Sequence, residues 1–275
     1  MRRPQRAAAS LVAIALALTA CGGDDGDVAD PGDGEDAGAA GFDLVEAGTL
    51  TVCSDLPYEP FEFEDPESES GYSGFDIDLM QAISEELGLE GPIAVRAVAF
   101  ESITSGAAMA GGDCDIAASA ITITEGRAEA LDFADPYYDS LQSLLVPEGS
   151  EITGLASTEG FRIGVQSGTT GEGYTDENAP DGAEIVRFEN TGDLFSAMDA
   201  GSIDGILQDL PVNAERARTT DGLEIVETYD TGESYGFAME QGRDDGLVEA
   251  INDALAAVRE SNTYDELYER YFGTE

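Results

Sequence analysis

The N-terminal part of the chain alternates short apolar runs with segments of helical spacing. The runs at 50–54, 93–99 and 116–121 have the length and composition of buried strands. Segment 76–87 carries apolar residues three and four positions apart, which predicts an amphipathic helix, and a second helix is expected over 102–110. Parallel strands need a crossover of this kind between them. The pattern therefore predicts an α/β fold with a parallel sheet covered by helices.

A second unit repeats this alternation further along the chain. The length of 275 residues suits one two-lobed unit or two small domains. We expect strands at 162–165, 184–188, 203–208 and 223–226, with helices after the turn at 167–170 and at 193–200, 210–217 and 247–258.

The end of the run 116–121 carries the clearest indication of a binding site. The chain turns there through Thr122 and opens a short helix at Thr124, a residue type favoured at helix starts. Arg127 falls in the first helical turn, where a cation gains nothing from the helix dipole. A guanidinium beside free N–H groups and the Thr122 hydroxyl suits a carboxylate. The alternative is a surface arginine that pairs with one of the chain's many carboxylates.

Five segments, in the expected order, resemble one protein family. These segments resemble the family 3 extracellular solute-binding proteins of ABC importers, which bind amino acids. The family includes glutamine-, histidine- and lysine-arginine-ornithine-binding types. The resemblance extends from about Phe42 to Gly273. The matching segments are 51–63 (TVCSDLPYEPFEF), 74–79 (GFDIDL), 119–140, 164–170 (GVQSGTT) and 262–273.

The resemblance implies a two-lobed periplasmic-binding-protein-like fold of type II, each lobe a parallel-rich sheet flanked by helices. The chain would then cross between the lobes twice, which makes the first lobe discontinuous. The implied division is 42–136 plus 236–275 for the first lobe, 142–230 for the second lobe, and 137–141 and 231–235 for the hinges.

The resemblance also assigns residues to the two charged ends of a bound amino acid. Arg127, the Thr122 hydroxyl and the backbone N–H groups of Ala120 and Thr170 would meet the carboxylate. Asp209 would pair with the α-ammonium, although its position alone also suits a cap for the helix that follows. Both ends need partners, because unpaired buried charges are costly.

Five further positions match those that contact the distal end of the ligand: Asp55, Tyr58, Phe100, Gln166 and Gln208. None is an arginine, which argues against glutamate or aspartate as the ligand. We expect a polar or cationic amino acid. For Tyr58 and Phe100 the alternative role is core packing.

The charge balance excludes several functions. All 12 basic residues are arginine, against 58 acidic residues, and the formal net charge is −46. Nucleic acid and anionic membrane surfaces are therefore unsuitable partners. The absence of histidine excludes Ser-His-Asp catalysis and histidine metal sites. Metal sites made of carboxylates alone stay open, but no EF-hand calcium-loop spacing is present, and we expect no metal and no cofactor. The composition favours a halophilic or salt-tolerant protein.

The N-terminus has the pattern of an export signal. Three arginines precede a small apolar stretch, which predicts a signal peptide over 1–20. Residues 18–21 (LTAC) resemble a bacterial lipobox, with lipidation at Cys21, although plain secretion is the alternative. Segment 21–41 is rich in Gly, Ala, Asp and Glu and predicts an acidic flexible tether. The expected location is the extracellular face of the membrane, or the periplasm if the cell has an outer membrane.

Two cysteines remain, Cys53 and Cys114. Export permits a disulfide. Cys53 lies on the expected strand 50–54 and Cys114 lies just before the run 116–121, and these two strands are neighbours in the family's sheet order. Spacing alone leaves open both a bridge and two buried thiols.

The expected function is that of a lipid-anchored, monomeric receptor that delivers an amino acid to an ABC permease. One rival is an enzyme of dehydratase type on the same fold, although no cluster of acid, base and nucleophile stands out. The other is a ligand-sensing subunit for a separate signalling partner.

We expect salt to stabilise the protein. Removal of the predicted signal peptide, which holds three arginines and no acidic residue, brings the formal charge to −49. Screening shortens from about 10 Å at 0.1 M salt to about 3 Å at 1 M, which relieves surface repulsion. The thermal midpoint should rise across that range. An unchanged midpoint would contradict the halophilic interpretation.

Overall fold

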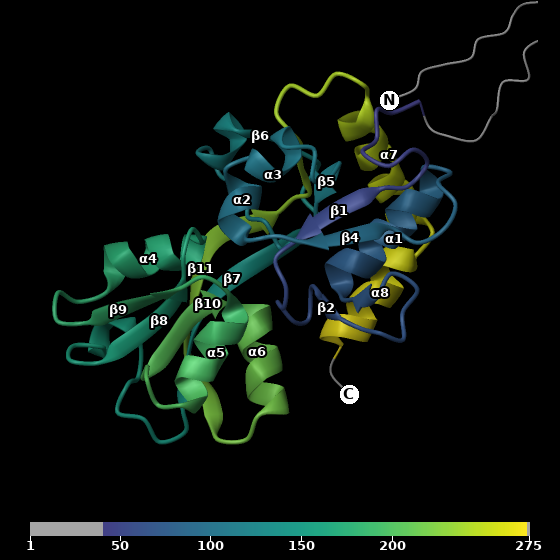
Figure 1. Ribbon diagram of the computed structural model, residues 1–275. Coiled ribbons are helices and arrows are strands. Elements are labelled where there is room, and N and C mark those ends of the chain that lie inside the picture. Colours follow the sequence, from purple (N-terminus) through teal and green to yellow (C-terminus); the bar gives the residue numbers. More distant parts are fainter. Residues whose placement is uncertain (1–40, 274–275) are drawn as a thin grey trace, which may run out of the picture. The chain divides into compact units, whose positions relative to one another are not determined.

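The computed structural model in Figure 1 describes residues 41–273. The predicted signal peptide, Cys21 and all but the last residue of the predicted tether lie outside these residues. Within 41–273, no helix combines the length and the apolar character that a membrane span requires.

Two five-stranded sheets organise this part of the chain. The first has the order β4-β1-β5-β12-β6, with β1 parallel to β4 and β5, and β12 antiparallel to β5 and β6. We call it, with its five helices, the first half. Its strands are β1 (Thr51–Ser54), β4 (Ala94–Ala97), β5 (Ile116–Ala117), β6 (Leu131–Phe133) and β12 (Ala238–Glu240), and its helices are α1 (Phe75–Glu86), α2 (Phe100–Thr104), α3 (Ala107–Ala110), α7 (Leu247–Glu260) and α8 (Thr263–Phe272).

The second sheet has the order β11-β7-β10-β8-β9. Strand β8 is parallel to β9 and β10, whereas β7 is antiparallel to β10 and β11. We call it, with its three α-helices, the second half. Its strands are β7 (Tyr138–Pro147), β8 (Arg162–Gln166), β9 (Glu184–Phe188), β10 (Gly205–Asp209) and β11 (Leu223–Tyr235), and its helices are α4 (Thr170–Asn178), α5 (Thr191–Asp199) and α6 (Leu210–Thr219).

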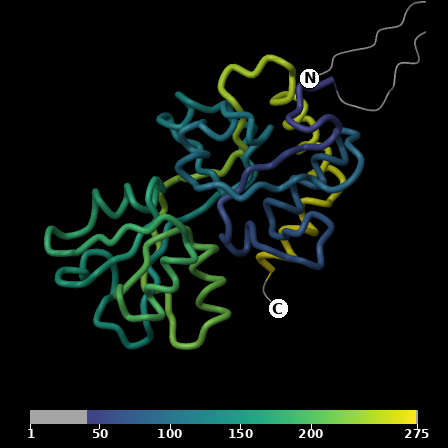
Figure 2. The backbone as a smooth tube through the Cα atoms, viewed as in Figure 1, coloured from purple at the N-terminus to yellow at the C-terminus, as the bar shows by residue number. Residues whose placement is uncertain are grey.

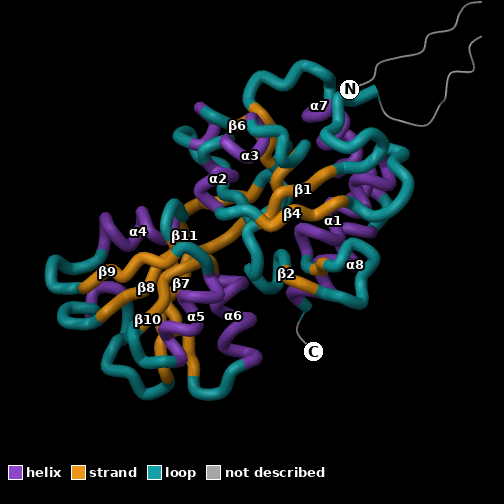
Figure 3. Tube along the Cα trace, viewed as in Figure 1, coloured by secondary structure: helices purple, strands orange, loops and turns teal. Residues whose placement is uncertain are grey.

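Figure 3 shows helices beside the strands of each sheet. The alternation of side chains along the strands builds a core on both faces of each sheet. In β1, Val52 packs in the cluster that holds α1, α7 and α8, whereas the next residue, Cys53, packs with α2 and α3. The second sheet follows the same rule. Leu144 and Leu207 belong to one cluster, and Leu145 and Ile206 to the other. Strands with two apolar faces require a helix layer on each side.

The two halves are joined by long strands rather than by loops. Strands β7 and β11 pair antiparallel, and the pairing continues to Ser140 opposite Glu233 and Tyr138 opposite Tyr235. Figure 2 shows the two stretches side by side. The expected hinges at 137–141 and 231–235 therefore lie within these paired strands, apart from Tyr137. Their role as hinges stays a prediction.

Two sequence expectations were only partly right. The run 116–121 pairs as a strand only at Ile116–Ala117, and the residues after it form a buried loop in which Ala120 has φ 44°. The helix expected over 102–110 divides into α2 and α3, because Gly106 adopts φ 77° between them. The loop after Ala117 resembled a strand because it is buried and largely apolar. Segment 102–110 resembled one helix because the residues before and after Gly106 are both helical.

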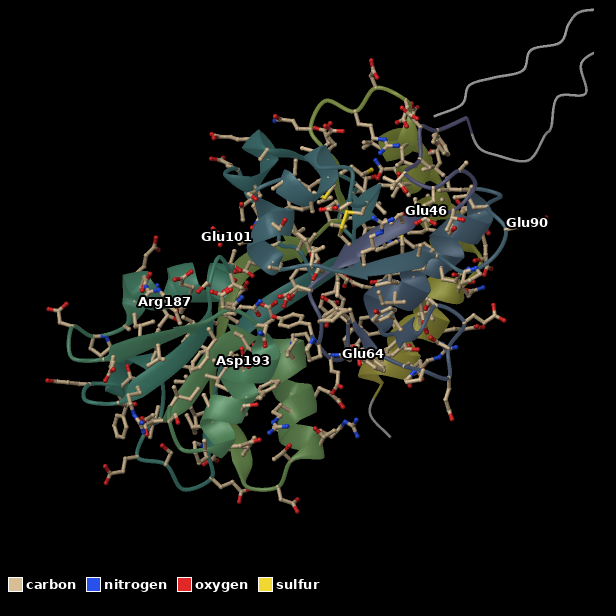
Figure 4. All side chains as sticks on the ribbon, in the orientation of Figure 1. Glu46, Glu64, Glu90, Glu101, Arg187 and Asp193 are labelled. Carbon is tan, nitrogen blue, oxygen red and sulfur yellow. A yellow bond between two sulfur atoms is a disulfide. The ribbon has the colours of Figure 1, made fainter. Side chains whose placement is uncertain are left out.

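Cys53 and Cys114 form a disulfide, with Cα atoms 5.7 Å apart. Figure 4 shows it as a yellow bond beside β1. The same view shows acidic side chains directed outward, including the exposed Glu46, Glu64, Glu90 and Glu101.

Gly74 fixes the start of α1 against the segment that carries Tyr58 to Glu62. Its φ is 129°, and a Cβ there would lie 2.1 Å from the Phe61 carbonyl oxygen. The backbone approach is close because Asp76 N donates to that same oxygen at 3.0 Å. Only glycine combines this φ with so close an approach.

We therefore expect Gly74→Ala to lower the free energy of unfolding by more than about 3 kcal/mol, since strain and a backbone clash add. Gly88→Ala is the matched control. Gly88 has φ 75° but open space around its Cβ position, so its cost should be about 1–2 kcal/mol. Urea denaturation of both variants measures the difference. Equal losses would contradict the packing role of Gly74.

Candidate functional site

One enclosed pocket gathers residues from both halves. It holds about 320 Å³ of space outside the protein atoms, including space that is open to solvent. Nine of the ten residues expected at the ligand line it, and their role in binding stays a prediction. The lining residues are Asp55, Tyr58, Phe100, Ser119, Ala120, Thr122, Arg127, Gln166, Thr169, Thr170 and Asp209.

Arg127 is buried without a carboxylate partner. It begins the short 3₁₀ helix η1 (Arg127–Glu129), and its N–H donates to Thr124 Oγ1 at 3.1 Å. Its guanidinium donates to the carbonyl oxygens of Thr122 at 2.8 Å and Gly168 at 3.1 Å. It also lies 5.1 Å from the ring centre of Phe100. Seven of the nine arginines between residues 41 and 273 form ion pairs, and Arg127 does not. Burial lowers its pKa, and nearby carboxylates oppose that shift.

Asp209 faces Arg127 from the second half, at the end of β10. Its carboxylate makes no capping bond to α6, which removes the alternative role. It accepts hydrogen bonds from Tyr58 Oη at 2.7 Å and Tyr235 Oη at 2.6 Å, and from the amide of Gln142. Burial raises its pKa to about 6 despite these donors. A buried carboxylate held in this way suits a cation.

Asp55 and Gln166 meet across the pocket. Gln166 Nε2 donates to Asp55 Oδ2 at 2.6 Å, and burial raises the pKa of Asp55 to about 6. The structure does not bring Gln208 into the pocket. Its amide donates to Asn213 Oδ1 at 2.9 Å, inside the second half. Gln208 was expected because the family resemblance matched it to the distal end of the ligand, but it lies next to Asp209 on β10, and neighbouring strand residues point to opposite faces.

Of the two backbone N–H groups expected to meet the ligand's carboxylate, that of Ala120 already has a partner within the protein. The N–H of Ala120 donates to Asp76 Oδ2 at 2.8 Å, so a buried carboxylate of the protein already uses it. Thr170 begins α4, where the first N–H groups lack an intrahelical partner. Thr169 caps that helix by accepting from Glu172 N at 3.1 Å.

Sequence reasoning missed Ser119 and Thr169 in the lining, and Gln142, Tyr235 and Glu233 around it. Ser119 and Thr169 lie inside segments that the family resemblance had already singled out, so their place in the sequence could have identified them as pocket residues. The others lie on β7 and β11, whose crossing parts were not recognised as strands.

Two buried carboxyl groups, Glu62 and Asp76, lie behind the pocket wall. Ser119 Oγ donates to Glu62 Oε1 at 2.7 Å, and Tyr137 Oη donates to Asp76 at 2.7 Å. Glu62 Oε2 has no hydrogen-bond partner. Burial raises the pKa of Asp76 to about 7. Burial, and then repulsion from Asp76, holds the pKa of Glu62 well above its usual range.

The part of the chain between residues 41 and 273 holds no group of three or more acidic or cysteine side chains placed to bind a metal ion.

Comparison with known proteins identifies the family. The sequence pattern of the bacterial extracellular solute-binding proteins, family 3, matches residues 50–274. The chain belongs to this family. It is therefore a solute-binding protein rather than an enzyme, in keeping with relatives that are named as binding proteins.

Individual relatives agree with this assignment. A probable histidine-binding protein of Neisseria gonorrhoeae is 34% identical over 98% of this chain and 95% of its own length. The ABC transporter glutamine-binding protein GlnH of Bacillus subtilis (strain 168) is 30% identical, over 74% of each chain. A solved structure of an ancestral arginine-binding protein bound to glutamine is 33% identical and superposes with a TM-score of 0.76. It covers 83% of this chain and 100% of its own. The expected fold class is confirmed, with two mixed sheets.

The carboxyl group of Glu62 should make stability depend on pH. A carboxyl group with a raised pKa keeps its proton in the folded protein after the unfolded chain has lost it, so stability falls as pH rises from about 4.5 toward 7. We expect the free energy of unfolding of Glu62→Gln to fall less steeply over this pH range. At pH 7 it should equal or exceed that of the wild-type protein. Denaturation at several pH values in 1 M salt measures this, with Glu64→Gln, an exposed neighbour, as the control. A Glu62→Gln profile parallel to wild type would contradict the buried-acid account.

Proposed function

We propose that this protein captures an amino acid in the pocket and delivers it to the permease of an ABC importer. One observation carries the proposal. A buried arginine with no carboxylate partner and a buried carboxylate line the same small cavity. No ion pair joins Arg127 and Asp209, so a zwitterion placed between them would satisfy both. The names of the relatives, which include histidine- and glutamine-binding proteins, support the same class of ligand.

The two ends of an amino acid fit the two sides of the pocket. We assign the carboxylate to Arg127, with the N–H of Thr170 at the start of α4 as a second donor. The α-ammonium pairs with Asp209. The Tyr58 hydroxyl already donates to Asp209, and its oxygen can accept a hydrogen bond from the α-ammonium. Phe100 packs on the guanidinium and holds its plane.

The distal end favours a polar or cationic side chain. Asp55 supplies a negative charge there, and Gln166 supplies an amide. Arg127 is the one basic residue that lines the described pocket, and its charge is already assigned to the α-carboxylate. A second carboxylate on the ligand would therefore lack a cation. Arginine, histidine, lysine and glutamine remain the candidates.

The binding site lies between two lobes that close on the ligand, with 42–136 plus 236–275 as one lobe and 142–230 as the other. Neither lobe alone supplies both Arg127 and Asp209, so a bound amino acid favours the closed form. The paired strands at 137–141 and 231–235 act as the hinges. The closed form is the one that the permease recognises.

Export and anchoring complete the proposal. A signal peptide over 1–20 directs secretion, lipidation at Cys21 anchors the monomeric protein, and segment 21–41 tethers the binding unit to the membrane. The excess of carboxylates over arginines suits a high-salt setting.

A thermal-shift screen of the twenty amino acids in high salt tests the proposed function. Binding to the folded state raises the midpoint by mass action. We expect one or a few polar or cationic amino acids to do so. No shift with any of the twenty at millimolar concentration would contradict the proposal.

Arg127→Ala should abolish binding of the amino acid that the screen selects. The loss of one partner of a desolvated charge pair costs about 2–5 kcal/mol, or two to four decades in affinity. Arg96→Ala is the control, because Arg96 pairs with Glu46 on the surface. Calorimetric titration measures both variants. Binding by Arg127→Ala within threefold of wild type would remove Arg127 from the site.

Asp209→Asn should weaken the amino acid far more than its deaminated analogue. The analogue lacks the ammonium group that Asp209 is assigned to bind. The same titrations give the two ratios of dissociation constants. Equal losses for both ligands would show that the assignment of Asp209 is wrong.

A further inference from the structure

Beside the pocket, one carboxylate oxygen of Glu233 accepts three hydrogen bonds. Thr170 Oγ1 donates to Glu233 Oε2 at 3.0 Å, Gln142 Nε2 at 3.0 Å and Thr122 Oγ1 at 3.3 Å. The donors come from the start of α4, from β7 and from the loop after β5. Glu233 itself lies on β11 and does not line the pocket. It therefore reaches a ligand only through these neighbours.

Two of the three donors are pocket residues. A threonine hydroxyl has one proton to donate. While the hydroxyl protons of Thr122 and Thr170 point toward Glu233, both side chains present lone pairs, not protons, to a carboxylate in the pocket. Glu233 thus competes with the ligand's carboxylate for the same two donors.

The charge of Glu233 acts on both ends of the site, with opposite consequences. Burial lowers the pKa of Arg127, and the carboxylates of Asp209 and Glu233 oppose the shift, so the field of Glu233 reaches the guanidinium. Gln142 connects Glu233 to Asp209, since its amide donates to both carboxylates. A negative charge here repels a ligand carboxylate at Arg127 and attracts an ammonium at Asp209.

An amino acid carries both groups, so the repulsion and the attraction largely offset one another. A 2-oxo or 2-hydroxy acid has the same carboxylate but no ammonium, and meets only the repulsion and the competition for hydroxyl protons. We propose that Glu233 is a specificity-determining residue that excludes carboxylic acids lacking an α-ammonium. This inference rests on the proposed function, because it assumes an amino acid between Arg127 and Asp209.

Glu233→Gln tests the proposal, because it keeps the size of the side chain and removes its charge. The probes are L-arginine, or L-glutamine if the screen selects it, with the corresponding 2-hydroxy acid and the corresponding decarboxylated amine. We expect Glu233→Gln to bind the hydroxy acid more tightly relative to the amine, by roughly tenfold, the scale of one hydrogen bond to a charged group. Glu177→Gln is the matched control. Glu177 is exposed and lines the recess beside Glu233, so the variant removes the same charge without touching Thr122 or Thr170.

Wild-type binding of the amino acid in the same titrations tests the proposed function separately. If the wild-type protein binds the amino acid, equal changes in the dissociation constants of the hydroxy acid and the amine in Glu233→Gln would overturn the role of Glu233. An equally large shift in Glu177→Gln would also overturn it, because the effect would then be general charge. Glu233→Asp is the second variant. Its shorter side chain moves the carboxylate away from the Thr122 and Thr170 hydroxyls but keeps the negative charge at this position of β11. The ratio of the dissociation constants of the hydroxy acid and the amine should therefore shift in the same direction by a smaller factor.

Discussion

A buried guanidinium without an anionic partner is the constraint on which this site depends. Taking a charge out of water costs several kcal/mol unless other groups compensate. For Arg127 the compensation is incomplete, since two backbone carbonyls and the face of Phe100 are its neighbours. The fold holds this charge opposite Asp209 without joining the two. The resulting site is complementary to a molecule with a carboxylate and an ammonium group.

The architecture places the two charges by simple means. Arg127 begins the 3₁₀ helix that follows β5 and its loop, and Asp209 ends β10 immediately before α6. This is the position at which ligands bind in α/β sheets. The paired strands β7 and β11 add Gln142, Glu233 and Tyr235, which hold Asp209 and the pocket threonines. The connection between the halves is therefore also part of the binding chemistry.

Much of this was predictable from the sequence, for identifiable reasons. Buried strands followed by amphipathic helices leave a strong pattern, so α1, α7 and β8 were placed within a few residues. The family resemblance then located nine of the pocket residues. Strand β7 was missed because its first six residues (YDSLQS) are mostly polar, although Ser140, Gln142 and Ser143 among them are buried. The loop at Ala120 resembled a strand because it is buried. The roles of Gln142 and Glu233 depend on strand pairing, which no local pattern encodes.

Small-angle scattering with and without ligand tests whether one amino acid bridges the two separately held charges. We expect a smaller radius of gyration at saturating concentrations of the amino acid selected by the screen, and no change in Arg127→Ala at the same concentration. Closure should follow binding, because the proposed ligand position lies between Arg127 of one half and Asp209 of the other. An unchanged radius in the wild-type protein, with binding confirmed by calorimetry, would contradict the account.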